Sequence, residues 1–174
     1  MSTGREQGFS LIELLVALAI ISVLAAIGVP GLLRARVAGN EASAIASLKL
    51  TSVSQVTYAA SCGGGGFAPS YLVLGTPPSS GTEEFISRDL GQSATPQKSG
   101  YDFALTPRTG ARAGPSDCNG TVTTTTWYAT GVPTSYATGN RGFAVDTNNS
   151  IWQDTSGAAP ATPFTVSATV AQIQ

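Results

Sequence analysis

Residues 8–33 read GFSLIELLVALAIISVLAAIGVPGLL, and this stretch decides how the chain is organised. Its last twenty residues, 14–33, contain no charged side chain. Twenty apolar residues at about 1.5 Å per residue form a helix of roughly 30 Å, the hydrocarbon thickness of a bilayer. A segment that is apolar all round its circumference belongs in lipid or in the centre of a large assembly. We therefore expect a transmembrane helix over about residues 14–33.

The sequence after this span keeps a helical pattern to about residue 60. Pro30 predicts a kink or a loosened stretch, and the helix could instead stop at Val29. Over residues 34–60 the helical pattern has a polar side and, opposite it, an apolar side. The apolar side comprises Val37, Ala38, Ala42, Ile45, Leu48, Val53, Val56 and Ala60. We expect one continuous helix over residues 9–60, whose second half packs one face on the head.

Composition restricts the classes of function. Charged residues make up 11% of the chain, the formal net charge is −1, and histidine is absent. Nucleic-acid binding would need a clustered basic face, which this charge balance does not favour. Histidine is the commonest general base and zinc ligand, and no nucleophile–base motif stands out among the other residues. We predict no enzymatic activity, no cofactor and no metal.

From about Ser61 the composition shifts to Gly, Thr, Ser and Pro with short apolar alternations. Glycines 63–66 end the helix, and residues 67–99 read mostly as loop, with helical turns at 70–74 and 83–90. Alternation and β-branched residues then predict strands, with Asn148-Asn149 as the turn of a hairpin. The predicted strands are 101–106, 121–130, 141–147, 150–154 and an edge strand around 164–170. The fold class is α+β: a long N-terminal helix packed on a small antiparallel sheet of three to four strands in a head at 61–174.

The string Gly8–Val16, preceded by the short polar leader 1–8, resembles the class III signal of the type IV pilin superfamily. This superfamily includes pilus subunits and the pseudopilins of type II secretion. The resemblance implies that a prepilin peptidase, a membrane aspartyl enzyme, cuts between Gly8 and Phe9 and methylates the new amine of Phe9. It also implies that Glu13 pairs with the N-terminus of a neighbouring subunit. The helix dipole disfavours a cation at a helix N-terminus, so a neighbour's carboxylate would neutralise it.

The resemblance implies a structural filament subunit. Such a subunit crosses the inner membrane once before assembly and then lies in an extracellular pilus or a periplasmic pseudopilus. Its partners would be its own copies through the N-terminal helices, the prepilin peptidase, and pilus or secretion assembly machinery. The stretch 142–152 also resembles the terminal hairpin of many small-headed pilins.

Three alternatives remain at this point. The chain could be a type II secretion pseudopilin or a membrane-anchored adhesin that never polymerises, although a mere anchor requires neither the leader nor Glu13. The N-terminus could also be an ordinary secretory signal, with Arg5 before the apolar run and cleavage after Ala25. Glu13 inside the apolar run, and the helical pattern that continues past Ala25, count against that interpretation.

Two further patterns lie in the head. Cys62 and Cys118 lack a C-x-x-C spacing, and in a head exported to an oxidising compartment we expect them to form a disulfide. Oxygen-bearing side chains also alternate around the predicted hairpin, and major pseudopilins can bind calcium in C-terminal loops. These side chains are Asp146, Asn148, Ser150 and Asp154. They lack the glycine and terminal glutamate of an EF-hand, so a hairpin turn is the favoured interpretation.

Overall fold

The computed structural model describes residues 9–173, so the leader expected at 1–8 lies outside the described residues. Helix α1 (Leu11–Ser61) has 51 residues and runs through Pro30 without a break. The expectation of one continuous helix is therefore confirmed, and the alternative stop at Val29 is wrong. The structure divides into two compact units after Arg36, the second of which joins the later part of α1 to the head.

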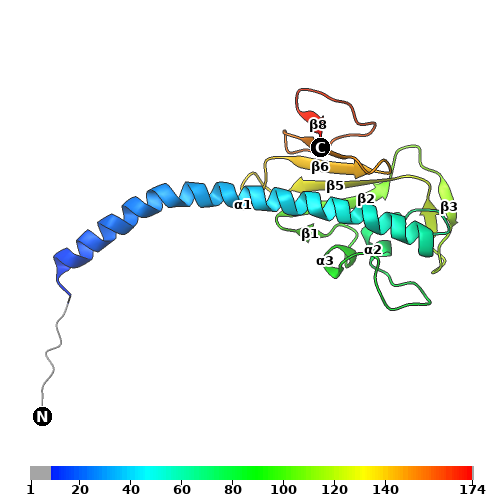
Figure 1. Ribbon diagram of the computed structural model, residues 1–174, viewed down its shortest axis with the longest axis horizontal. Coiled ribbons are helices and arrows are strands. Elements are labelled where there is room, and N and C mark those ends of the chain that lie inside the picture. Colours follow the sequence, from blue (N-terminus) through cyan, green and yellow to red (C-terminus); the bar gives the residue numbers. More distant parts are fainter. Residues whose placement is uncertain (1–8, 174) are drawn as a thin grey trace, which may run out of the picture. The chain divides into compact units, whose positions relative to one another are not determined.

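The head contains a six-stranded antiparallel sheet in the order β1-β2-β5-β6-β7-β8 (Figure 1). Its strands are β1 (Gln97–Lys98), β2 (Tyr101–Pro107), β5 (Trp127–Pro133), β6 (Gly142–Asp146), β7 (Ile151–Asp154) and β8 (Val170–Gln172). Our estimate of three to four strands was too low. The two edge strands, β1 and β8, have two and three residues, too few for an alternating pattern to mark them. The edge strand that we predicted around 164–170 is wrong in its bounds, because residues 155–169 form a loop and β8 begins only at Val170.

The threonine-rich stretch 121–130 is not a single strand, contrary to our prediction. Its first part, β4 (Val122–Thr124), pairs with β3 (Ala113–Ser116) in a separate two-stranded sheet, and β5 begins only at Trp127. The Thr124 hydroxyl donates to the carbonyl of Thr126 (3.0 Å), which holds the bend between the two strands. A run of threonines contains no glycine, proline or asparagine to reveal this bend.

Two short helices lie in the region expected to be mostly loop. Helix α2 (Tyr71–Leu74) matches the turn predicted at 70–74, and Ser70 caps its first turn through its side chain. Helix α3 (Arg88–Gly91) overlaps only the end of the turn predicted at 83–90.

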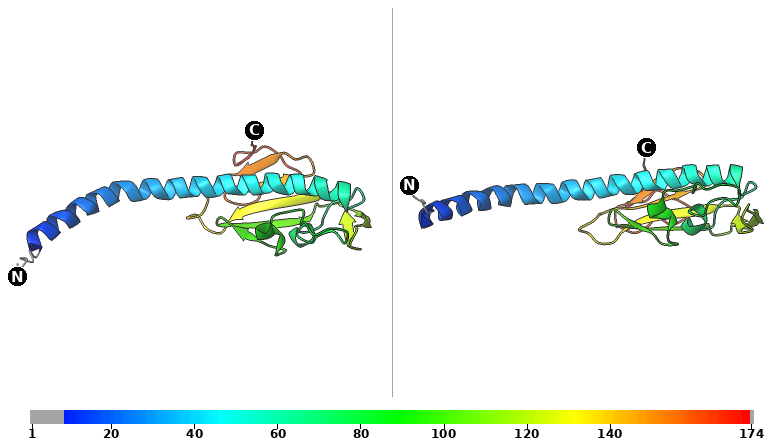
Figure 2. Two further views of the ribbon diagram at one scale, coloured as in Figure 1. Left: turned by 60° about the horizontal axis from the view of Figure 1, so that its bottom comes forward. Right: turned by 90° about the horizontal axis from the view of Figure 1, so that it is seen from below.

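The second half of α1 lies across one face of the sheet (Figures 1 and 2). The residues it buries are mostly polar: Glu41, Ala44, Ser47, Leu48, Thr51, Ser52, Ser54, Gln55 and Tyr58. By contrast, Val53 and Val56 on the apolar side are 63% and 53% exposed. Most of the apolar side that we identified therefore faces away from the core of the head, with Leu48 as the main exception.

This inversion is possible because the head supplies hydrogen-bond partners to the largest of the buried polar side chains, Glu41, Gln55 and Tyr58. The side-chain amide of Gln55 donates to the carbonyl of Ala68 and accepts from its N–H, both at 2.8 Å. The hydroxyls of Thr51 and Tyr71 lie 3.0 Å apart in the same interface. A buried polar group that finds such a partner is no longer costly to bury, so hydrophobic periodicity alone cannot identify this packing face.

The opposite face of the sheet is covered by the loop 155–169 between β7 and β8. Phe164 of this loop stacks on Trp152 with ring centroids 5.2 Å apart, and the Tyr128 hydroxyl donates to the carbonyl of Pro160. Gly142 sits so close to the loop that a side chain there would collide with the carbonyl of Ala158. With both faces covered, β6 is buried along its whole length.

Candidate functional site

The N-terminal motif begins α1 with a local hydrogen-bond arrangement. The backbone N–H of Ser10 donates to Glu13 Oε2 (2.9 Å), and the N–H of Leu14 donates to the Ser10 carbonyl (3.3 Å). A Ser followed three residues later by Glu is the capping-box pattern, in which the glutamate reaches back to the backbone of the first residue. We missed this role of Glu13, although the Ser-x-x-Glu spacing signals it in the sequence.

Glu13 keeps acceptor capacity beyond this cap. A carboxylate offers about four acceptor positions on its two oxygens, and the Ser10 amide occupies one of them. Phe9 is 87% exposed. The resemblance to type IV pilins implies that the amine of this residue pairs with Glu13 of a neighbouring subunit. Gly8, on the other side of the expected cleavage point, lies outside the described residues. Capping within one chain and pairing with a second chain are therefore compatible.

The surface around this motif is apolar and uncovered. Every residue from 9 to 36 is exposed, and most of the large hydrophobic side chains exposed in the described chain lie between Phe9 and Leu33. By length and composition, α1 can cross a membrane, and the apolar stretch that qualifies it has no buried residue. A signal sequence near an N-terminus can have the same length and apolar composition. A core helix of a soluble protein, by contrast, would be buried and would not leave this surface exposed.

An ion pair between the buried Glu41 and the half-buried Arg141 joins the second half of α1 to the sheet. Arg141 donates from Nη2 (2.6 Å) and Nε (2.9 Å) to Glu41 Oε2, while the N–H groups of Asn140 (3.0 Å) and Arg141 (3.3 Å) donate to Oε1. The guanidinium also donates to Gln153 and lies over the ring of Phe143, 5.5 Å from its centroid. Burial alone would raise the pKa of Glu41, but these hydrogen bonds and the charge of Arg141 hold it below its ordinary value.

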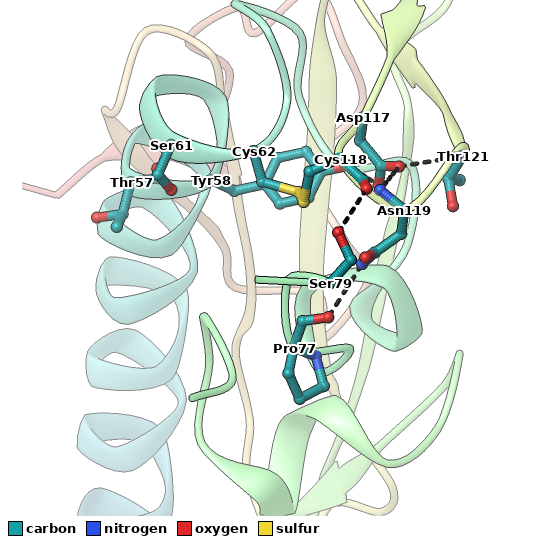
Figure 3. Close-up of a disulfide and its surroundings, with 10 residues drawn as sticks. All are labelled: Thr57, Tyr58, Ser61, Cys62, Pro77, Ser79, Asp117, Cys118, Asn119 and Thr121. Carbon is teal, nitrogen blue, oxygen red and sulfur yellow. Dashed lines mark hydrogen bonds between the residues drawn. A yellow bond between two sulfur atoms is a disulfide. The ribbon is translucent and has the colours of Figure 1, made fainter. Parts of the chain in front are cut away.

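The predicted disulfide between Cys62 and Cys118 is present, with the two Cα atoms 4.9 Å apart (Figure 3). Cys62 follows the last residue of α1, and Cys118 lies between β3 and β4. The Cys118 N–H donates to the Cys62 carbonyl (2.9 Å), and the Ser79 hydroxyl donates to the Cys118 carbonyl (2.9 Å). The bond therefore ties the end of the helix to a loop that is itself pinned to residues 77–79.

Asp117, next to the disulfide, organises this corner. Its Oδ2 accepts from the hydroxyl of Tyr58 on α1 (2.6 Å), and its Oδ1 accepts from the N–H groups of Asn119 (2.9 Å) and Thr121 (2.7 Å). Burial, followed by the hydrogen bond and the negative charge of Asp117, raises the pKa of Tyr58 above its ordinary value. The carboxylate of Asp117 therefore joins α1 to the loop between β3 and β4.

The hairpin between β6 and β7 uses its carboxylates for its own turns. Asp146 Oδ1 accepts from the N–H of Asn148 (2.9 Å), and its Oδ2 lies 3.4 Å from Arg108 Nη1. Asn149 has φ of +60°, the backbone conformation expected of the turn. Asp154 Oδ1 accepts from the N–H of Ser156 (2.8 Å), a bond that lowers the pKa of Asp154. Within residues 9–173, no cluster of three or more His, Cys, Asp or Glu side chains is placed to hold a metal ion.

Comparison with known proteins recognises the N-terminal segment. Residues 3–29 match the family model described as the prokaryotic N-terminal methylation motif. No curated protein and no solved structure matches the chain. The matched residues contain Gly8, Phe9, Glu13 and most of the apolar span, which were the basis of the resemblance. The chain therefore carries the class III prepilin signal of the type IV pilins and pseudopilins, at the start of a long apolar helix.

Proposed function

We propose that the chain is a structural subunit of a type IV pilus-like filament. Prepilin peptidase cuts it between Gly8 and Phe9 and methylates Phe9, and assembly machinery then moves it from the inner membrane into an extracellular filament of its own copies. The observation that carries this proposal is the methylation motif, with Glu13 as the only charged side chain in an exposed apolar helix from Phe9 to Leu33. A carboxylate at the edge of a membrane-spanning helix is expensive to place in lipid and is retained where it has a partner.

The position of Glu13 favours a polymer over a simple membrane anchor. A membrane anchor needs only sufficient length and hydrophobicity, and residues 14–33 supply both without Glu13. In a polymer, the amine of Phe9 on one subunit meets the Glu13 carboxylate of the next, and the pair sets the axial register. Its role is specificity more than net stabilisation, because desolvation offsets much of the attraction.

A pseudopilus subunit would use the same processing and the same pairing. The pilus is favoured by the turn chemistry of the C-terminal hairpin and its exit, where Asp146 and Asp154 each accept from a backbone amide two residues further on and so serve the turns.

Two substitutions of Glu13 separate its two roles. Glu13→Gln keeps an oxygen that accepts from the Ser10 amide and removes the negative charge, whereas Glu13→Ala removes both. We expect both proteins to be made, cleaved and retained in the membrane, and both to be depleted from sheared filaments. Losing one partner of a buried pair costs about 3–5 kcal/mol, which is enough to prevent incorporation. Glu84→Ala, which removes an exposed carboxylate of the head, is the matched control and should assemble like the parent.

The measurement compares membrane and sheared fractions in cells that contain no other copy of the subunit. Mass spectrometry of the mature protein should find an N-methylated Phe9 in all four proteins. If Glu13→Gln assembles like the parent while Glu13→Ala does not, Glu13 acts as a helix cap and the pairing account is wrong. A mature protein that begins at Met1 or Ala26 would contradict the filament proposal as a whole.

A further inference from the structure

The turn that joins β5 to β6 leaves an aromatic side chain in solvent. Residues 134–137 are all exposed, and Tyr136 among them is 81% exposed, whereas the other four tyrosines of the chain are buried or half-buried. No charged side chain lies between Trp127 and Asn140. A side chain with an apolar ring and a polar tip suits a boundary between water and an apolar phase.

This turn is held in one conformation by its own hydrogen bonds. Thr138 donates from its N–H (3.0 Å) and from its hydroxyl (2.8 Å) to the Ser135 carbonyl, and the N–H of Gly139 donates to the same carbonyl (3.2 Å). Gly139 lies against Tyr101, where a side chain would collide with the phenol. Tyr136 is therefore presented outward by an ordered turn, so that little conformational freedom is lost when it binds a partner.

A hollow with hydroxyl groups in its walls lies beside Tyr136. Its volume is ≈ 240 Å³, and it is lined by Pro133, Thr134, Ser135, Tyr136, Ser156 and Gly157. Serine and threonine hydroxyls can donate to the oxygens of a phosphate. The hollow therefore offers polar contacts of the kind that a phospholipid headgroup can use, next to a ring that suits the edge of the hydrocarbon.

The turn lies at the end of the head where α1 enters (Figure 2). The Asn40 side-chain amide donates to the Thr138 carbonyl (2.9 Å), within the same compact unit as the head. Only residues 34–39 separate Asn40 from the apolar span. Asn40 thus follows Leu33 by about 10 Å of helix, and the headgroup layer of one leaflet is roughly 5–7 Å thick.

We propose that the turn 134–138 binds phospholipid headgroups at the membrane surface through Tyr136, while the subunit is held in the inner membrane before assembly. The inference rests on the membrane stage of the proposed function and adds a second attachment to that made by α1. Tyrosine is enriched at membrane–water interfaces, where its ring lies at the level of the headgroups. Arg34 and Arg36, the first charged residues after the span, are exposed and can attract anionic headgroups of the same leaflet.

The second attachment would orient the head. A single membrane helix leaves the head free to rotate about the helix axis, whereas a contact at Tyr136 fixes which side of the head faces the bilayer. Membrane helices tilt by about 20° on average, which brings one side of a head closer to the headgroups. One tyrosine makes a weak contact, so the subunit can still leave the membrane when it is assembled.

Photo-cross-linking to lipid tests the proposal on the full chain. The chain is reconstituted into vesicles of phosphatidylethanolamine and phosphatidylglycerol that contain a phospholipid with a diazirine on its headgroup. After irradiation, adducts are mapped by mass spectrometry. We expect adducts at two places, on α1 just after Leu33 and on residues 134–138. Val122, exposed on β4 at the other end of the head, should carry none (Figure 1).

Substitutions of Tyr136 identify the group that binds. Tyr136→Ser should lower the adducts on residues 134–138 about five- to tenfold, the factor that covering about a quarter of an aromatic side chain gives. Tyr136→Trp, which keeps an aromatic ring suited to the interface, should retain them. Val122→Ser, which removes an exposed apolar side chain at the other end of the head, is the matched control and should leave the pattern unchanged.

The outcomes separate this inference from the function on which it rests. Adducts on α1 with none on residues 134–138 would overturn the inference, as would an unchanged pattern in Tyr136→Ser. Both results leave the filament proposal standing. A parent chain without adducts on α1 does not cross the bilayer as proposed, which would refute the membrane stage of the function together with this inference.

Discussion

The ion pair between Glu41 and Arg141 is expected to be a main stabiliser of the contact between helix and sheet. The Glu41 side chain is 8% exposed, and its carboxylate accepts four hydrogen bonds from Arg141 and Asn140. We consider Glu41→Gln, which preserves the size of the side chain and one acceptor oxygen for the backbone amides. It removes the charge that the guanidinium faces.

The magnitude lies between two limits. Removing one partner of a fully buried pair costs about 3–5 kcal/mol, whereas an exposed pair contributes about 0.2–1 kcal/mol. Arg141 is 37% exposed, so water can partly solvate it when Glu41 is neutral, and Gln153 and Phe143 still hold it. We therefore expect a loss of about 2–3 kcal/mol in the free energy of unfolding. For a head of this size, that corresponds to a fall of about 5–12 °C in the melting temperature.

Thermal unfolding of the full chain in detergent, followed by tryptophan fluorescence, measures this loss. Both tryptophans, Trp127 and Trp152, lie in strands of the head, so the signal reports the head itself. Glu84→Ala, which changes an exposed glutamate, is the control and should stay within about 0.5 kcal/mol of the parent.

The effect of pH gives an independent check. The pKa of folded Glu41 lies below its ordinary value of 4.5, so the unfolded chain binds this proton more tightly than the folded one. The contribution of ionised Glu41 to the free energy of unfolding is therefore complete above about pH 5, and it is lost as the pH falls through the pKa of Glu41 in the folded protein. Asp89 and Asp154 also have lowered pKa values, but they are present in the parent and in Glu41→Gln alike. Their effects therefore cancel in the difference in stability between these two proteins. A Glu41→Gln protein that melts with the parent at every pH would refute the stabilising role.

Three further substitutions test other contacts by the same unfolding measurement. Replacing Cys62 and Cys118 by serine should lower stability by about 2–4 kcal/mol, and reductant should then destabilise only the parent; an equal response in both would contradict this. Gln55→Leu leaves the N–H and carbonyl of Ala68 unpaired and should cost about 2–3 kcal/mol, with faster amide exchange at Ala68; unchanged exchange would argue against it. Gly142→Ala forces the covering loop off the sheet and should cost about 1–3 kcal/mol, with faster proteolysis of that loop; a silent substitution would show the loop to be dispensable.

Much of the architecture could be predicted from local patterns. The uncharged run 14–33, the polar leader and the period-2 alternation in β2 each express one physical preference strongly, and the helix, the N-terminal motif and strand β2 follow from them. The hairpin turn at Asn149 was predictable for the same reason, because few residues tolerate its backbone conformation.

The packing face of α1 could not be predicted in this way. Gln55, Thr51 and Glu41 are buried because partners distant in sequence, at Ala68, Tyr71 and Arg141, complete their hydrogen bonds. A pattern read along one helix contains no information about those partners. The cap formed by Glu13 was readable from its spacing to Ser10, but the resemblance directed our interpretation of Glu13 to a second chain.

The disulfide has a mechanical consequence. In the filament proposed above, a subunit under load would be pulled between its helix and the surfaces of its head. Because Cys62 is bonded to Cys118, the 55 residues between them cannot extend under such a force. At roughly 3.3–3.6 Å per residue, this withholds about 180–200 Å of contour length, so tension that opens the head can release only the residues after Cys118. A stretched head would therefore lengthen by much less than its chain length suggests, and reduction of this one bond would set the hidden length free.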